Sequence, residues 1–336
     1  SNQLFNNVSD ATSTVQMFVN GQINRDYDNY IVQPDDEIVI VYGSNPVVSM
    51  NTNFGSMVIE LFPEQTPITV NNFLNYINGT TQNGGNYDGT FFHRGAEIAG
   101  EEFVIQAGGF TTPTESFTDA DQFQSIVTDP AITNEPGISN LRGTIAMAKL
   151  GGDPNSATSQ FFVNLSDSNA GSPASLDTQN GGFTMFGQVL DLTTADRIAA
   201  IPTDDKNTNS TTAFNELPVT TDDRLAIIES FTGQGSITGV KFQDTNQDGT
   251  QDPGEAGIGG VRVFIDTNNN GMFDAGELST LTDADGRFLL QTDPGTQIVR
   301  AEVSSGAMQT APTSPDSHIV DVVLGRVVED LLFGEF

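Results

Sequence analysis

Apolar and polar residues alternate in short stretches along most of the chain, which is the pattern of half-buried β-strands. Near the start, the stretches VQMFVNG and DDEIVIVYG (residues 15–21 and 35–43) alternate in this way, and the first ends in an Asn-Gly turn signal. We therefore predict a small β element within residues 1–45. No chemistry is evident in it, and we interpret it as an N-terminal extension that packs on the next domain.

Residues 46–232 combine apolar strands with two short helices. Strands are predicted in the stretches NFGSMVIELF, GTIAMAK and SQFFVNL. A helix is predicted over residues 66–79, where Pro stands at the start and Gly at the end, and a shorter one over residues 193–201. Several strands, few helices and long Gly/Asn/Asp-rich loops indicate a closed or nearly closed β architecture.

The pattern changes near residues 231–239, where we place a domain boundary. Beyond it, strands are separated by acidic, Gly-rich loops, and one internal repeat appears. Its copies are DTNQDGTQDPGE, which starts at Asp244, and DTNNNGMFDAGE, which starts at Asp266. We therefore divide the chain into a β extension of unknown role (1–45), a first domain (46–232) and a second domain (233–336).

Composition narrows the classes of function. The formal net charge of −32 argues against nucleic acid and anionic membrane surfaces as partners. Cysteine is absent and only two histidines occur, which excludes disulfides and thiol chemistry and disfavours a His-rich zinc or iron site. The sequence contains no run of eighteen apolar residues, so we predict no membrane insertion. Ser1 opens no signal-peptide pattern, so a targeting segment would have to lie outside this sequence.

The two repeated twelve-residue stretches match the formula of the EF-hand calcium loop. Oxygen ligands are expected at loop positions 1, 3, 5, 7 (a backbone carbonyl), 9 and 12. The first copy supplies Asp244, Asn246, Asp248, Thr250, Asp252 and Glu255, and the second supplies Asp266, Asn268, Asn270, Met272, Asp274 and Glu277. The alternative is that these Asp-Asn-Gly clusters only form hairpin turns.

Calcium is the expected ion, because magnesium requires a tighter octahedron. The first loop carries four carboxylates and the second three, so we predict tighter binding at the first. Pro253 and the glycines at 257, 259 and 260 would interrupt an exiting helix, so the loops are predicted to lie on a β scaffold rather than in a paired EF-hand sensor. Calcium loops without cysteine favour a secreted or cell-surface setting, with a cytoplasmic one left open.

The stretch FFHRG holds one of only twelve cationic side chains. Taken alone, its Arg reads as a surface cation stacked on an aromatic ring. Other stretches surround it in order: IELFPEQTPITVNNFLNY before it, then FVIQAGG, NEPGISNLRGTIAMAK, SATSQFFVNL and FTMFGQV. Together these resemble the cyclophilin-type peptidyl-prolyl isomerases, particularly bacterial members, over about residues 47–201.

That resemblance implies a mainly β fold, namely an eight-stranded antiparallel β-barrel closed by two helices. It also implies an enzyme that acts on proline-containing polypeptides without a cofactor. It implies that Arg94 is the catalytic residue and Gln106 its polar neighbour. The implied substrate-binding residues are Phe103, Val104, Ala148, Gln160, Phe162, Leu176 and Phe183. His93 is interpreted as structural, because rotation about an X–Pro bond needs no base.

The chain departs from the family pattern beside the arginine. Eight residues, GAEIAGEE, separate Arg94 from Phe103, where four are usual. Their glutamates would bring negative charge near the arginine, either quenching it or favouring basic peptides. Ser175 stands where some members carry Trp, which by resemblance implies weak binding of cyclosporin.

Residues 235–336 resemble the SdrD B-like calcium-binding modules of bacterial surface proteins, through GSITGVKFQDTNQDG, GIGGVRVFID, TDADGRF and a closing FGEF. The resemblance implies an immunoglobulin-like β-sandwich stiffened by Ca²⁺, with Asp283 and Asp285 as additional candidate ligands.

These observations favour an extracellular peptidyl-prolyl isomerase with a calcium-stabilised accessory module. The rival is a non-catalytic extracellular matrix or adhesion protein whose barrel only binds proline-containing segments. Extracellular or cell-surface proteins are the expected partners. Arg94 with Gln106 argues for the enzyme, since a pure binder needs neither. A calcium sensor is disfavoured because no helix pair is present to open.

Overall fold

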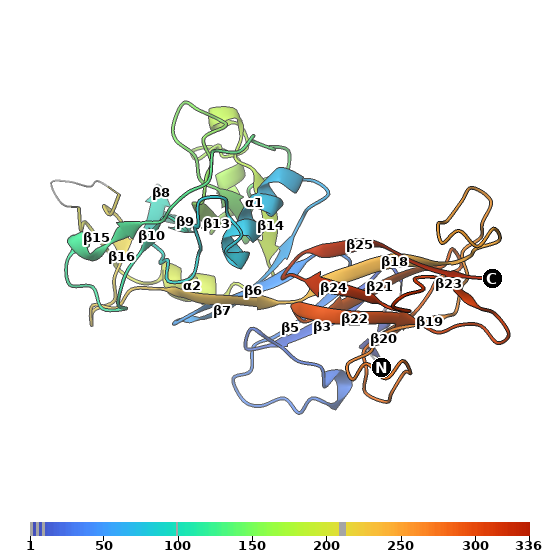
Figure 1. Cartoon of the computed structure of the whole chain (residues 1–336). Helices are drawn as coiled ribbons and strands as arrows, with labels where there is room; N and C mark the ends of the chain where they lie inside the picture. Colours follow the sequence, from blue (N-terminus) through green and yellow to red (C-terminus); the bar gives the residue numbers. More distant parts are fainter. Residues whose placement is uncertain (1–2, 5–6, 9–10, 99, 208–212) are drawn as a thin grey trace. The chain divides into compact units, whose positions relative to one another are not determined.

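The computed structural model describes residues 3–4, 7–8, 11–98, 100–207 and 213–336. Its contacts divide the chain into two compact units. We call them the barrel unit (Asn20–Gln22 and Val47–Thr232) and the sandwich unit (Ser1–Val19, Ile23–Pro46 and Gly233–Phe336). Figure 1 shows both as strand-rich. No helix in the described ranges is long and apolar enough to cross a membrane.

The barrel unit is built on one eight-stranded antiparallel sheet in the order β17-β6-β7-β14-β12-β13-β9-β8. The strands in chain order are β6 (Val47–Thr52), β7 (Gly55–Leu61), β8 (Arg94–Ile98), β9 (Glu101–Ala107), β12 (Thr144–Met147), β13 (Phe161–Asn164), β14 (Met185–Val189) and β17 (Ile228–Gly233). All four residues of β12 and of β13 are buried, which fits their continuous apolar runs.

The two ends of this sheet are joined by the residues next to its edge strands. Phe92 N donates to Ala226 O (2.9 Å), and Ile228 N donates to Thr90 O (2.7 Å). The sheet is therefore curled and nearly closed. The prediction of eight strands with two helices is confirmed.

The helices of the barrel unit are α1 (Pro67–Asn78) and α2 (Thr193–Ala199). Pro67 begins α1, and Gly79 ends it in the left-handed conformation (φ 63°), as the sequence pattern predicts. The Glu135 carboxylate accepts hydrogen bonds from the backbone of Ile68 and Thr69, so a distant loop caps the helix. The buried face packs on the sheet through Phe73, whose ring meets Phe161 and Phe186.

Short elements complete the barrel unit. They are β10 (Phe110–Thr111), β11 (Gln124–Ser125), β15 (Thr203–Asp204), β16 (Leu217–Pro218) and the 3₁₀ turns Ala120–Gln122, Asp167–Ala170 and Gln179–Gly181. The antiparallel pairs β10–β11 and β15–β16 lie outside the main sheet.

In the sandwich unit, two four-stranded sheets share one apolar core. One sheet has the order β21-β18-β25-β23 and the other β20-β19-β22-β24. The strands are β18 (Gly235–Gln243), β19 (Arg262–Ile265), β20 (Ser279–Leu281), β21 (Arg287–Thr292), β22 (Gly295–Ala301), β23 (Gln309–Ala311), β24 (His318–Val322) and β25 (Val327–Glu335). Core residues come from both sheets, among them Ile237, Val263 and Phe333. The predicted β-sandwich is confirmed.

The N-terminal residues form a small sheet, β4-β3-β5, that belongs to the sandwich unit. Its strands are β3 (Thr14–Val19), β4 (Gln22–Ile23, which spans the boundary between units) and β5 (Ile38–Gly43). The pair β1 (Gln3–Leu4) and β2 (Asn7–Val8) and a 3₁₀ turn at Tyr27–Asn29 complete this region. Thr14 Oγ1 donates to the side chain of Gln291, and Arg25 pairs with Asp293. The expectation that this extension packs on the next domain in sequence is therefore wrong, because these long-range contacts tie it to the C-terminal module.

Candidate active site

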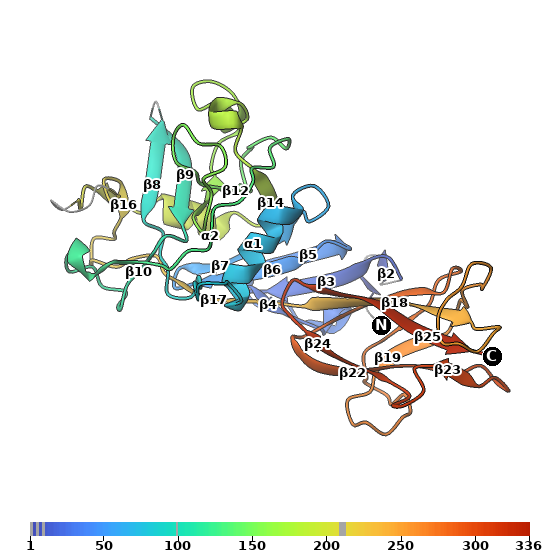
Figure 2. The same cartoon turned by 45° about the horizontal axis from the view of Figure 1, so that its top comes forward.

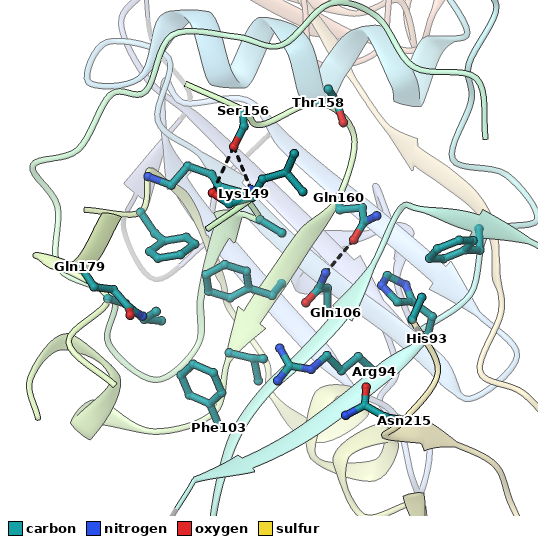
Figure 3. A pocket seen from close by; sticks show the side chains of 18 residues that line it. His93, Arg94, Phe103, Gln106, Lys149, Ser156, Thr158, Gln160, Gln179 and Asn215 are labelled. Atoms are coloured by element: carbon teal, nitrogen blue, oxygen red, sulfur yellow. Dashed lines mark hydrogen bonds between the residues drawn. The ribbon is translucent and has the colours of Figure 1, made fainter. Parts of the chain in front are cut away.

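One cavity of about 580 Å³ opens on the barrel unit. All nine residues assigned above to catalysis or substrate binding line it: Arg94, Phe103, Val104, Gln106, Ala148, Gln160, Phe162, Leu176 and Phe183. They come from positions spread over 90 residues of sequence. Figure 3 shows their side chains around one hollow.

The sheet places the polar residues in one row. Arg94 on β8 pairs in register with Gln106 on β9, and Gln106 pairs with Phe162 on β13. Paired residues on neighbouring strands project to the same face, so these three side chains lie side by side. Gln106 Nε2 donates to Gln160 Oε1 (2.7 Å), which fixes both amides (Figure 3).

The apolar wall of the cavity belongs to a packed cluster. Val104, Phe162 and Leu176 are buried in it, with Phe103, Ala148 and Phe183 partly buried against them. The Phe162 and Phe183 rings meet at 5.8 Å between centroids and 70°. A ring-sized apolar group can therefore be held next to the donors of Arg94.

Buried asparagines hold this wall in place. Asn169 Nδ2 donates to Phe103 O (2.8 Å), and Asn140 Nδ2 donates to Phe183 O (3.1 Å). Asp177 accepts from Asn140 N (2.8 Å). Burial would raise the pKa of Asp177, but its hydrogen bonds from Asn140 outweigh that and lower it. The sequence analysis missed this network, because each Asn there is one of many in the chain.

Two cationic residues line the cavity, and they have different hydrogen-bond partners. Arg94 Nε donates to Glu216 Oε2 (2.7 Å), a residue 122 positions away. Lys149, which the sequence analysis did not single out, donates to the carbonyls of Asn180 and Gly182 and lies 4.6 Å from the Phe183 ring centroid.

His93 is buried beside Arg94 and packs edge-on against Phe110. Burial is the main cause that lowers its pKa from 6.5 to about 4, and the positive charge of Arg94 contributes to the same shift. His93 is therefore neutral at pH 7, which agrees with a structural interpretation.

The inserted glutamates lie on a hairpin. β8 and β9 extend past Arg94 and pair up to Ile98 and Glu101, and Figure 2 shows the two strands side by side. Glu97, Glu101 and Glu102 are exposed. The carboxylate that pairs with Arg94 is that of Glu216 instead.

The two twelve-residue loops of the sandwich unit share one geometry. The Asp at position 1, Asp244 or Asp266, is buried and accepts from the backbone N–H of positions 5 and 6. The Glu at position 12, Glu255 or Glu277, accepts from the backbone N–H of positions 2 and 9.

Side chains at positions 3, 5 and 9 converge in both loops. Asn246 Nδ2 donates to Asp248 and Asp252, and in the second loop the Nδ2 atoms of Asn268 and Asn270 both donate to Asp274. Burial would raise the pKa of Asp244, but accepted hydrogen bonds lower it. The Asp and Asn side chains that meet in each loop carry hard oxygen atoms, which are the ligands that calcium prefers. No group of three or more His, Cys, Asp or Glu poised for a metal occurs in the described ranges, so the amide and carbonyl oxygens would be needed.

The loops differ at position 1. Arg300 Nε donates to Asp266 Oδ2 (2.6 Å) in the second loop, and its pKa is raised by its carboxylate partners despite burial. Asp283 accepts from Asp285 N and Arg287 N in a turn of its own. In the part of the chain that the structure describes, no hydrogen bond or ion pair joins Asp283 or Asp285 to the carboxylates of either loop.

The chain matches two known families in the predicted order. "Cyclophilin type peptidyl-prolyl cis-trans isomerase/CLD" matches residues 47–216, and "SdrD B-like domain" matches residues 235–324. The first match extends past the predicted limit and includes Glu216.

Individual relatives of the chain carry the same description as the first family. A peptidyl-prolyl cis-trans isomerase of Acinetobacter baylyi is 37% identical over 163 residues, covering 48% of this chain and 75% of the relative. Peptidyl-prolyl cis-trans isomerase B of Escherichia coli is 36% identical over 160 residues, covering 47% and 86%. A crystal structure of a Cryptosporidium parvum cyclophilin-type isomerase aligns with a TM-score of 0.39 at 25% identity, covering 56% of this chain and 96% of that one. The chain belongs to the cyclophilin-type peptidyl-prolyl cis-trans isomerase family and is a peptidyl-prolyl isomerase.

Proposed function

We propose that the cavity beside Arg94 binds X–Pro segments of polypeptides and that Arg94 drives their isomerisation. The observation that carries this is the row formed by Arg94, Gln106 and Phe162, which puts a fork of donors beside an apolar wall. The proline ring would lie against Phe103, Phe162 and Leu176. Ala148 and Gln160 would contact the peptide backbone, with Val104 and Phe183 closing the apolar wall.

The chemistry asks for no nucleophile, base or metal. Amide resonance sets the uncatalysed barrier at roughly 18–20 kcal/mol. A turnover on the order of 10³ s⁻¹ corresponds to a barrier of about 13 kcal/mol, so about 5–7 kcal/mol must be supplied. A hydrogen bond donated to the prolyl nitrogen stabilises the twisted state, in which that nitrogen has lost its conjugation. Arg suits this role because it keeps its proton at every relevant pH.

Relaxation of a cis X–Pro peptide, followed by exchange NMR at one calcium concentration, tests the proposal. We expect the intact chain to accelerate it and Arg94→Ala to lower kcat/KM by about 10²–10³-fold, the usual loss for a transition-state donor. Arg224→Ala is the matched control, since Arg224 pairs with Glu115 on the same unit.

The rival function gives a different result. A chain that binds the peptide in the same NMR titration without accelerating exchange would be a proline-segment binder, and the catalytic role of Arg94 would be overturned. Acceleration that survives Arg94→Ala would place the catalytic donor elsewhere.

We also propose that the loops starting at Asp244 and Asp266 bind Ca²⁺ as a structural ion. Support comes from the Asn and Asp side chains that meet at positions 3 and 9 of each loop and from the match to the SdrD B-like family. Binding should be tighter at the first loop, because Arg300 already neutralises Asp266 in the second. Without the ion, the clustered carboxylates repel and the loops should loosen.

Calorimetric titration with Ca²⁺ separates the two sites. Glu255→Gln should abolish the tighter step, Glu277→Gln the weaker one, and the exposed Glu329→Gln neither. A titration without heat in the intact chain would return both stretches to ordinary turns.

We propose a secreted or cell-surface setting, with proline-containing extracellular proteins as substrates. The absence of cysteine, the calcium loops and the SdrD B-like match favour it. Extracellular modules of this kind bind calcium at about 10⁻⁴–10⁻³ M, a concentration that the cytosol does not reach. Antibody labelling of intact cells and of culture medium tests it, and signal confined to lysed cells would refute it.

A further inference from the structure

Arg94 has a partner that the sequence did not indicate. Its Nε–H donates to Glu216 Oε2 at 2.7 Å, and the two side chains are 36% and 30% exposed. Glu216 directly precedes β16, outside the main sheet. This contact bears on the proposed function, because it fixes the side chain assigned to catalysis.

The backbone of Glu216 is held firmly against β8. Glu216 O accepts from Gly95 N (2.8 Å), directly after Arg94. A Cβ atom at Gly95 would lie 3.2 Å from Pro218 Cγ and from Thr203 Cγ2, so the β15–β16 pair packs closely on this point of β8.

The residues that flank Glu216 are buried in an apolar cluster. Phe214 and Leu217 are buried in a cluster with Phe91 and Leu225. The Phe214 ring meets Phe110 at 4.9 Å, and Phe110 in turn packs on His93. Glu216 therefore sits on a rigid support rather than on a free loop.

The carboxylate approaches Arg94 from outside the cavity. Ala213 and Asn215 line the cavity together with Arg94, whereas Glu216 is not among the described lining residues. Figure 3 shows the Arg94 side chain reaching across the cavity toward Phe103, with Asn215 beside it. Because Glu216 engages the Nε–H, the two terminal nitrogens of the guanidinium are left as donors for a bound substrate.

We propose that Glu216 is a positioning residue, which orients the Arg94 guanidinium for the prolyl nitrogen. Charge neutralisation is the competing effect, but an ion pair this exposed is strongly screened. Solvent does not screen the orientation of the Arg94 side chain in the same way. A single hydrogen bond at Nε fixes the plane of the rigid guanidinium group. The inference rests on the proposed role of Arg94.

The kinetics of four variants of the full chain test this: Glu216→Ala, Glu216→Gln, Arg94→Ala and the double variant Arg94→Ala/Glu216→Ala. Glu216→Ala should lower kcat about tenfold with KM little changed, since misplacing a catalytic group acts on the transition state. Glu216→Gln keeps an acceptor oxygen and should retain activity within about threefold. In the Arg94→Ala background, Glu216→Ala should have no further effect. Glu97→Ala is the matched control, because Glu97 is an exposed carboxylate on the β8–β9 hairpin that carries Arg94.

A spectroscopic readout accompanies the kinetics. The ¹⁵N and ¹H shifts of Arg94 Nε–H should move in Glu216→Ala and stay near those of the intact chain in Glu97→Ala.

The outcomes separate cleanly. An active intact chain with Glu216→Ala equally or more active overturns the inference, and higher activity in both Glu216 variants identifies a quenching carboxylate instead. A loss that persists in the Arg94→Ala background also overturns it, because Glu216 would then act on the substrate. An inactive intact chain overturns the proposed function itself.

Discussion

The adjacent residues His93 and Arg94, at the beginning of β8, lie in different electrostatic environments. Arg94 is partly exposed and pairs with a carboxylate, whereas His93 is buried and its pKa falls to about 4. A neutral His93 adds no second positive charge next to the donor. His93 therefore adds no positive charge to the proposed site at pH 7.

His93 should make stability depend on pH. In the unfolded chain it takes up a proton near pH 6.5, and in the folded chain only near pH 4. Between these values the unfolded state binds more protons, so stability is full above about pH 6.5 and falls as pH drops toward 4. Urea unfolding at pH 7.5, 6 and 5 measures this, with His93→Phe as comparison. The variant should lose less stability than the intact chain over that range, and an equal loss in both would contradict the assignment.

The residues of the cavity were predictable because each lies in a short motif whose order along the chain is informative. Arg94, Gln106 and Phe162 follow this rule. Glu216 does not, because a lone Glu has no local pattern and only the packing of Phe214 and Leu217 brings it to Arg94. Lys149 was missed for the same reason.

At the scale of elements, the inserted stretch GAEIAGEE shows where pattern and structure part. Its glutamates suggested a charged loop near Arg94, but Ala96 is buried, Glu97 exposed and Ile98 half-buried, which is the alternation of a strand. The insertion therefore lengthens a hairpin. The helix α1 was predictable to its ends because Pro67 and Gly79 mark them, whereas its cap, Glu135, comes from a distant loop.

The strands β18 and β25 hold a buried ion pair that no motif indicated. Lys241 Nζ lies 2.8 Å from Glu335 Oε2, and both side chains are almost fully buried. Burial would raise the pKa of Glu335, but the hydrogen bond from Lys241 and those from Ser304 lower it. Each charge is thus tolerated in the core because the other is present.

Removing one partner should cost more than removing both. Lys241→Met should lower the free energy of unfolding of the sandwich unit by about 3–5 kcal/mol, because Glu335 is left buried without its cation. Lys241→Met/Glu335→Leu should recover most of that loss. Denaturant titrations of the three chains measure it, and a double variant no more stable than the single one would refute the explanation.

At the scale of the whole molecule, the chain passes between two units that have separate cores. The N-terminal sheet and the C-terminal sandwich belong to one unit although more than 180 residues separate them in sequence. Strand patterns were sufficient to predict both β domains. Which domain the first residues join depends on long-range contacts such as Thr14 with Gln291, which local patterns do not encode.

Separate cores should give separate thermal transitions. Calcium should raise the Tm of the transition that Lys241→Met lowers, since the loops and the ion pair share the sandwich unit. Chelation should lower that transition and leave the other within about 1–2 °C, because both proposed calcium loops lie in the sandwich unit. Scanning calorimetry with calcium and with chelator tests this, and one transition that shifts as a whole would show that the units unfold together.

The parallel pairing of β18 with β25 has a mechanical consequence. Their register runs from Ser236 beside Val327 to Gln243 beside Glu335. A force that pulls Gln234 and Phe336 in opposite directions would load these hydrogen bonds simultaneously in shear, rather than opening them one after another from an end. The strand that leads out of the barrel unit is therefore fastened in the arrangement that resists tension best, and the module would hold its shape under load along this axis.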